Sequence, residues 1–139
     1  LVIDLPPGTG DAPLTVMQIA SKEKVLNSFG VIDVFTPQDL TTMVVRKAVK
    51  MARKMNVRVL GVIENMSYLL LPETRKKMEI FGRSKGEEMA KASEAPLLGQ
   101  LPIDPELAKL CDEGEIERYS SDAVSEMSAN VVAVLNEKW

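Results

Sequence analysis

Cysteine and histidine are almost missing from this sequence, which has one cysteine and no histidine in 139 residues. A single thiol excludes an internal disulfide and a metal site built only from cysteines of this chain. Without histidine there is no imidazole for acid–base chemistry or for metal ligation. We expect the one thiol, Cys111, to be a small buried or half-buried residue, and a cytoplasmic location is the simplest expectation for this cysteine usage.

Long apolar runs and excess positive charge are missing as well. No run approaches the roughly 18 residues of a membrane helix, so we expect no stable membrane insertion. The net charge of −3 gives no general attraction to nucleic acid. The hydrophobic fraction of 45% is that of an ordinary globular protein, and the length suits one domain. Because the sequence starts at Leu1 inside an apolar run, we expect a fragment, a processed chain or a trimmed one.

Short apolar blocks alternate along the chain with stretches of helical spacing. The predicted strands are Leu1–Leu5, Gly30–Thr36, Val57–Ile63 and Leu97–Leu101. The predicted helices are Gln38–Met55, Ser84–Glu94, Asp104–Cys111 and Ser121–Lys138. Strands that are apolar throughout are typical of parallel sheets covered on both faces. The alternation therefore predicts an α/β fold with right-handed crossovers.

Some segments fit this pattern less well. Ser21–Phe29 is polar and is either a loop or a helix extension. Asn65–Phe81 is long for a connection in a compact domain. Within it, we expect Leu69–Lys77 to form a helix packed on the core, with a membrane- or partner-touching amphipathic segment as the alternative. Asp33 lies inside an apolar strand pattern, and we expect it to be paired or to face a gap.

The most informative segment is the first one, where an apolar strand ends in Asp4 and a turn rich in proline and glycine follows, Pro6-Pro7-Gly8-Thr9-Gly10-Asp11. In open α/β sheets, ligands bind at the carboxyl ends of the strands. A carboxylate there can hold Mg²⁺ through water, and Gly8 lets a backbone N–H approach a phosphate. The alternative is an ordinary strand-to-turn junction in which Asp4 caps the following segment.

Five sequence blocks follow one another along the chain: Ile3–Asp11 (IDLPPGTGD), Thr36–Asp39 (TPQD), Gly61–Tyr68 (GVIENMSY), Ile80–Arg83 (IFGR) and Leu97–Pro105 (LLGQLPIDP). Together they resemble the carboxy-terminal part of the Mrp/ApbC family, MinD-related P-loop ATPases that act as iron–sulfur cluster carriers or assembly factors. The resemblance spans essentially the whole sequence. It implies the carboxy-terminal half of a parallel-sheet P-loop NTPase (MinD-like) fold. Residues 1–139 would then be the part of the ATPase domain without its phosphate loop.

The resemblance also implies a site for ATP and Mg²⁺. Asp4 would be the Walker-B-type carboxylate near the Mg²⁺ ion, and Gly8 the backbone sensor of the terminal phosphate. Asn65 would read the adenine edge with its amide, which suits a purine. Pro102 and Asp104 would line the base.

Three of these residues have a second interpretation that needs no nucleotide. Asn65 could be a strand-end turn residue that bonds its own backbone. Pro102 and Asp104 could belong to a turn followed by a helix that Asp104 caps and whose first position is Pro105. We expect the capping role of Asp104 whether or not a nucleotide binds.

The sequence departs from the family in two places. The glycine-rich phosphate loop lies upstream of Asp4 in the family and is missing here, so we expect no ATP hydrolysis from these residues alone. The family's Cys-x-x-Cys pair would fall at Leu71 and Thr74, so the iron–sulfur cluster lacks its thiolate ligands. Two alternatives to the family function remain: a cysteine-less, MinD-like switch that dimerises on ATP, and an inactive truncated remnant.

The expected partners follow from the same comparison. In the complete family fold, the phosphate-loop strand lies between the strand of Asp4 and Gly30–Thr36. Without it, two strand edges are open to pairing. We therefore expect a homodimer or pairing with a missing amino-terminal half, in addition to ATP and iron–sulfur client proteins.

Overall fold

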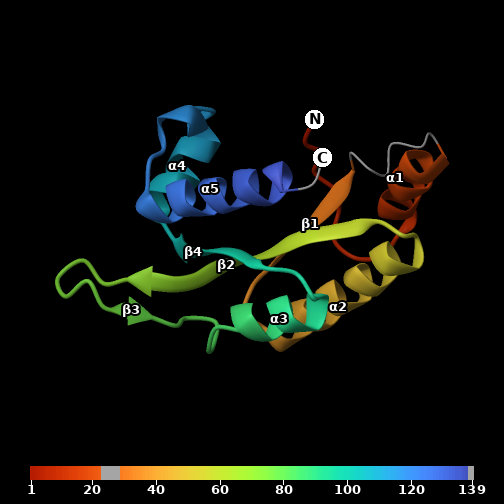
Figure 1. The fold of residues 1–139 in the computed structure, drawn as a ribbon. Helices are drawn as coiled ribbons and strands as arrows, with labels where there is room; N and C mark the ends of the chain where they lie inside the picture. The colour runs from red at the N-terminus through yellow and green to blue at the C-terminus, as the bar shows by residue number, and fades with distance from the viewer. Residues whose placement is uncertain (23–28, 138–139) are drawn as a thin grey trace.

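The computed structural model describes residues 1–22 and 29–137 of the chain (Figure 1). Its elements, in chain order, are α1 (Asp11–Lys22), β1 (Gly30–Phe35), α2 (Asp39–Lys54), β2 (Arg58–Leu70), β3 (Lys77–Met78), α3 (Gly86–Ser93), β4 (Leu97–Ile103), α4 (Pro105–Glu113), the 3₁₀ helix η2 (Ile116–Arg118) and α5 (Asp122–Asn136). In the part of the chain so described, no helix has both the length and the apolar character needed to cross a membrane.

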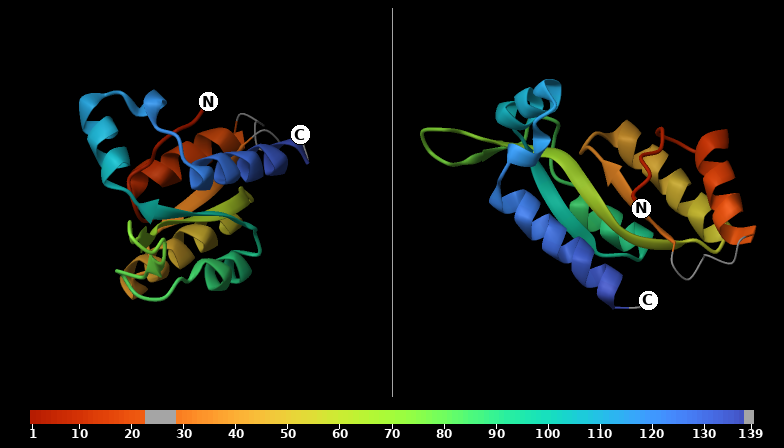
Figure 2. Two further views of the ribbon diagram at one scale, coloured as in Figure 1. Left: turned by 90° about the vertical axis from the view of Figure 1, so that its left-hand side faces the viewer. Right: turned by 90° about the horizontal axis from the view of Figure 1, so that it is seen from above.

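The long strand β2 organises the sheet. It pairs in parallel with β1 and with β4, and its last residues pair antiparallel with β3. Because Leu69 is paired with both Met78 on β3 and Ile103 on β4, these two strands lie on opposite sides of β2. Helices α2 and α3 cover one face of the sheet and α5 covers the other (Figures 1 and 2). This is a layered α/β arrangement.

The main core lies between the sheet and the pair α2 and α3. It is built from Phe35, Val45, Val49, Val62, Met89 and Ala90. Helix α2 contributes the stripe Thr42, Val45, Val49 and Ala52, whose spacing places these side chains on one face. A second cluster joins α1 to the end of α2 through Met17, Ala52 and Val57.

Most predicted elements are confirmed to within a few residues, but β2 runs to Leu70, seven residues beyond the predicted end at Ile63. Three of the four predicted strands correspond to β1, β2 and β4, and the four predicted helices to α2, α3, α4 and α5. The end of the last predicted helix, Lys138, lies outside the described residues. Ser121 begins α5 as expected, since its hydroxyl accepts a hydrogen bond from the N–H of Val124 at 3.2 Å.

The predicted strand Leu1–Leu5 is wrong: this segment is coil and largely exposed. A β-strand needs a neighbour that completes its backbone hydrogen bonds, and no strand in the described ranges pairs with it. The coil leads past β1 into α1, a helix that the sequence pattern did not predict (Figures 1 and 2). Two residues of Ser21–Phe29 belong to the end of α1, and residues 23–28 lie outside the described part of the chain.

The predicted helix over Leu69–Lys77 is also wrong, because the segment forms a β-hairpin. Strand β2 continues to Leu70, a turn follows, and β3 returns at Lys77. The turn is closed by two backbone hydrogen bonds, from the N–H of Leu71 to the carbonyl of Lys76 and from the N–H of Arg75 to the carbonyl of Leu71. The positively charged side chain of Lys77 lies over the ring of Tyr68, 4.1 Å from its centroid.

Cys111 is exposed, which corrects the expectation that it would be buried or half-buried. The reason is the orientation of α4, whose one buried residue is Leu110, next to Cys111 in sequence. The side chains of neighbouring residues on a helix point about 100° apart. When Leu110 points into the core, Cys111 therefore points toward solvent.

Asp33 is half-buried on β1, and burial raises its pKa to about 6. Its Oδ2 atom is buried and has no hydrogen-bond partner in the described structure. β1 lies at the end of the strand order and pairs only with β2 there, so its other edge is open. Among the described residues, the side chain of Asp33 has no hydrogen-bond or ion-pair partner, so its charge is costly at neutral pH.

This raised pKa predicts that stability falls as pH rises. Since the pKa of Asp33 is raised from 3.8 to about 6, the folded chain holds the proton more tightly than the unfolded chain between these values. The free energy of unfolding should fall by up to about 3 kcal/mol across that window and then level off. Asp33→Asn should remove most of this slope in urea titrations.

Asp112→Asn, at an exposed position on α4, is the matched control and should leave the slope in place. A slope that persists in Asp33→Asn would show that another group causes it.

Candidate functional site

The carboxyl ends of β1, β2 and β4 form one edge of the sheet, where ligands bind in folds of this type. The pairing of β1 with β2 stops at Phe35 and Glu64, and β2 continues beyond this point into the hairpin. Asn65 is therefore the first residue of β2 past the end of β1. On the other side of β2, Pro102 lies near the end of β4, opposite Tyr68.

Asn65 lies in a β-bulge of β2. The pairing with β4 passes from Glu64 opposite Gln100 to Tyr68 opposite Pro102, so a step of four residues on β2 (64 to 68) faces a step of two on β4 (100 to 102). Such bulges redirect side chains and are common beside functional sites. Met66, inside this bulge, has a φ of 53°, in the left-handed region that a methionine rarely adopts.

The side chain of Asn65 is half-buried, and one end of its amide is engaged. Its Oδ1 accepts a hydrogen bond from the N–H of Met66 at 2.9 Å, so the local-backbone interpretation of this residue is confirmed. The Nδ2 group makes no hydrogen bond to any other described residue. A free amide donor at the strand edge matches an acceptor atom on a purine ring. The two interpretations of Asn65 are therefore compatible.

Beneath the bulge lies the carboxylate of Glu64, which the sequence reading did not single out. The residue is 0% exposed, and its carboxylate accepts four hydrogen bonds. Oε2 accepts from the hydroxyls of Ser67 at 2.7 Å and Ser84 at 2.6 Å and from the amide of Gln100 at 2.8 Å. Oε1 accepts from the backbone N–H of Lys85 at 2.6 Å.

These contacts decide the charge of Glu64. Burial by itself raises the pKa of this carboxyl, but the hydrogen bonds from Ser84, Ser67, the Lys85 backbone and Gln100 together lower it below its ordinary value. The carboxylate is therefore ionised at neutral pH. Its one visible sequence signal is a charged residue directly after the apolar block Gly61–Ile63, a signal similar to the one at Asp33.

Both carboxylate oxygens of Asp104 accept hydrogen bonds from other residues of the fold. Oδ1 accepts from the N–H of Glu106 at 2.9 Å and so caps α4, whose first residue is Pro105. Oδ2 accepts from the hydroxyl of Tyr119 at 2.7 Å. The capping prediction is confirmed. The Tyr119 contact, which the sequence did not indicate, ties α4 to the segment after η2.

Asp4 and Gly8 lie in the coil that precedes α1 and belong to none of the strands described so far. Asp4 is exposed and makes no hydrogen bond or ion pair to another described residue. Gly8 has a φ of +96°, which suits a glycine and few other residues. An exposed carboxylate of this kind fits the one or two protein ligands that Mg²⁺ usually takes. Among the described residues, no group of three or more acidic, histidine or cysteine side chains is arranged to hold a metal.

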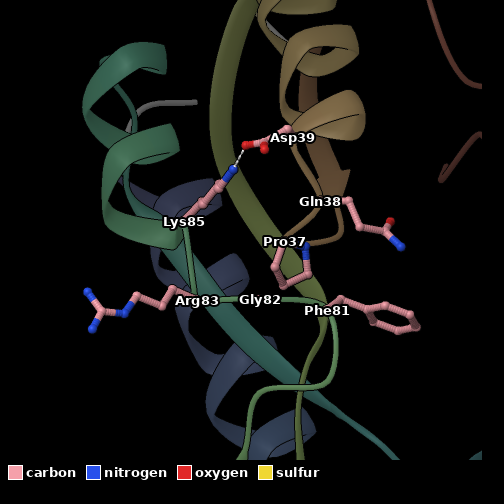
Figure 3. Close-up of a pocket in the computed structure, with 7 residues that line it drawn as sticks. All are labelled: Pro37, Gln38, Asp39, Phe81, Gly82, Arg83 and Lys85. Carbon is pink, nitrogen blue, oxygen red and sulfur yellow. Dashed lines mark hydrogen bonds and ion pairs between the residues drawn. The ribbon is translucent and has the colours of Figure 1, made fainter.

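A groove of about 440 Å³ lies beside the hydrogen-bonded cluster of Glu64, Ser67, Ser84, Lys85 and Gln100. Figure 3 shows the residues that line this groove. One wall is Pro37–Asp39, in the connection from β1 to α2. The other wall is in the turn before α3 and consists of Phe81, Gly82, Arg83 and Lys85. Asp39 and Lys85 form an ion pair across it, while Gln38 and Phe81 project to the opposite side from Arg83. The backbone of Lys85 also donates to Glu64, so one wall of the groove is fixed to the buried carboxylate.

The residues do not fit an iron–sulfur cluster. Leu71 and Thr74, where the family's cysteines would fall, lie in the turn of the β2–β3 hairpin and carry no thiol. Cys111 lies on α4, in a different part of the fold. A cluster needs several thiolates within bonding reach of one another, which this segment does not provide.

Comparisons with known proteins identify relatives over nearly the whole chain. An iron–sulfur cluster carrier protein of Aquifex aeolicus is 41% identical over 139 residues, which is 99% of this chain and 36% of that protein. A protein of the same name from Clostridium perfringens is 46% identical over 88% of this chain and 40% of its own length. The cytosolic Fe-S cluster assembly factor CFD1 of Candida glabrata is 42% identical over 81% of this chain and 38% of its own length. The chain thus spans less than half the length of these relatives.

Two solved structures have a fold similar to that of this chain. A nucleotide-binding protein of Archaeoglobus fulgidus, solved in complex with ADP, matches with a TM-score of 0.71 and 43% identity, over 86% of this chain and 47% of that one. The cell division protein MinD of Aquifex aeolicus matches with a TM-score of 0.52 and 17% identity, over 78% of this chain and 44% of that one. The predicted α/β, MinD-like P-loop NTPase fold is confirmed.

A family model described as ParA, NUBPL iron-transfer P-loop NTPase, matches residues 1–137. This match and the iron–sulfur carrier relatives confirm the resemblance predicted from the sequence blocks. The chain belongs to the ParA family of NUBPL-like iron-transfer P-loop NTPases.

Proposed function

We propose that this chain is the base-recognising, carboxy-terminal part of an ATP–Mg²⁺-binding P-loop ATPase that serves iron–sulfur cluster assembly in the cytoplasm. The observation that carries the proposal is the bulge at Asn65, which leaves an amide donor free at the ligand edge of the sheet. Support comes from the relatives, whose names describe iron–sulfur cluster carriers and a nucleotide-binding protein with ADP. Pro102 lies across from the bulge on β4 and is suited to line the base.

The proposed role of each residue toward the nucleotide follows from its hydrogen-bonding groups and its charge. The free Nδ2 group of Asn65 can donate to N7 of adenine, and Oδ1, which has a second lone pair beside the one used by the N–H of Met66, can accept from N6. Asp4 would hold Mg²⁺ through water, and the backbone of Gly8 would contact the terminal phosphate. Asp104 acts indirectly, because it holds the start of α4 beside the base. The phosphate loop and the hydrolytic groups would come from sequence outside these 139 residues.

The test is nucleotide binding by the full-length protein that contains this segment. Asn65→Ala should weaken ADP binding by about tenfold, because a buried base edge loses its hydrogen-bond partner. Asn136→Ala, at an exposed position at the end of α5, is the matched control and should bind ADP like the unmodified protein. Affinity can be measured by calorimetry. Equal affinity of all three proteins would contradict the proposal.

A second candidate function is favoured by one observation, the lack of thiols in the β2–β3 hairpin. A protein of this family without those ligands would act as an ATP-dependent dimerisation switch that recruits a partner, and iron–sulfur clusters would not be its cargo.

Cluster reconstitution separates carrier from switch. The full-length protein, treated anaerobically with iron and sulfide, should show little sulfur-to-iron charge-transfer absorbance from this segment. The double variant Leu71→Cys/Thr74→Cys should gain that absorbance, because it restores a Cys-x-x-Cys spacing in the hairpin turn. If the unmodified protein already shows the full band, cluster ligands lie elsewhere in the protein and the switch function is wrong.

A further inference from the structure

Glu64 and Ser67 form the two ends of the bulge that carries Asn65. Their side chains are joined by a hydrogen bond of 2.7 Å, so Asn65 and Met66 are held in a loop closed by Glu64 and Ser67. The positive φ of Met66 costs free energy that the surroundings must supply. A bulge of this kind keeps one conformation only when contacts on either side hold it, and the Glu64–Ser67 bond is such a contact.

The same carboxylate connects the bulge to two other elements. It accepts from Ser84 and from the Lys85 backbone at the start of α3, and from Gln100 on β4. Gln100 also donates to the hydroxyls of Ser84 at 2.6 Å and Ser67 at 3.3 Å. Because Glu64 is 0% exposed and Ser67 is 2% exposed, water cannot readily replace these donors. The bulge is thus fixed in relation to both α3 and the strand that bears Pro102.

We propose that Glu64 is a positioning residue for base recognition: through Ser67 it fixes the bulge so that the amide of Asn65 is presented to the purine, with Nδ2 as donor and the second lone pair of Oδ1 as acceptor. This inference rests on the proposed function, since it assigns a role toward the nucleotide that Asn65 would bind. Glu64 itself does not contact the ligand, because its carboxylate is covered. Its effect on binding is carried by the shape of the bulge.

Ser67 is the best place to test the inference. Ser67→Ala removes one hydrogen-bond donor from Glu64 and leaves the other three. The carboxylate therefore stays hydrogen-bonded, and we expect the fold to be retained. Ser93 provides a matched control: it is also 2% exposed, but its hydroxyl has no hydrogen-bond partner among the described residues. Ser67→Ala and Ser93→Ala therefore make the same chemical change at equal burial, and only one of them opens the bulge.

The experiment measures binding of ADP, GDP and inorganic tripolyphosphate to the full-length protein. Ser67→Ala should weaken ADP binding by about tenfold and reduce the preference for ADP over GDP, as expected when a hydrogen-bonded contact is lost. Tripolyphosphate has no base, and its affinity should not change. Ser93→Ala should alter none of the three affinities. The double variant Asn65→Ala/Ser67→Ala should bind ADP no more weakly than Asn65→Ala, because both changes remove the same contact.

The outcomes separate this inference from the proposed function. If Asn65→Ala lowers the ADP preference but Ser67→Ala does not, the positioning role is wrong and the nucleotide site stands. If Ser67→Ala weakens ADP and tripolyphosphate equally, its effect is general damage and the positioning role is again wrong. If Asn65→Ala leaves the preference for ADP unchanged, the proposed base site fails and the positioning role fails with it.

Discussion

The structure depends on one buried charge, the carboxylate of Glu64. An ionised carboxylate removed from water costs several kcal/mol or more unless hydrogen-bond donors replace the water. Here the donors come from β2 itself, from the turn before α3 and from β4. Three segments must therefore meet at one point and in one register. A shift of β2 by one residue would turn Glu64 to the other face of the sheet and leave its donors without an acceptor.

The β2–β3 hairpin, the turn before α3 and the groove all lie next to this buried charge. β2 continues past β1 because the bulge after Glu64 adjusts its pairing with β4, and the continuation forms the hairpin with β3. The turn before α3 is held by Ser84 and Lys85, and it forms one wall of the groove beside Asp39. The carboxyl edge of the sheet is thus held by these hydrogen bonds, which a binding site at this edge would need if its polar groups are to be placed accurately.

The sequence predicted what depends on local pattern and missed what depends on distant partners. The apolar strands and the caps at Ser121 and Asp104 have local causes, and they were found. The donors to Glu64 lie 20 and 36 residues away in the sequence, in Ser84 and Gln100, so no local pattern predicts them.

Other segments depend on strand pairing. The leucines at 69–71 fit a helix or a strand equally, and pairing with β3 decides between them. The run Leu1–Leu5 has the composition of a strand but no pairing partner in the described ranges. Sequence motifs indicated Asn65, yet the bulge and the free amide nitrogen became visible only in three dimensions.

The most direct test of this account is the titration of Glu64, followed through its carboxyl carbon by nuclear magnetic resonance in the protein labelled with ¹³C. We predict that this carboxyl has a pKa below the ordinary value of 4.5, despite its full burial, because the four hydrogen bonds favour the charged form. As pH falls through that lowered pKa, the stability that the cluster contributes should be lost. A Glu64 carboxyl that takes up its proton above 4.5 would show that burial outweighs the donors, and the central role of this charge would be contradicted.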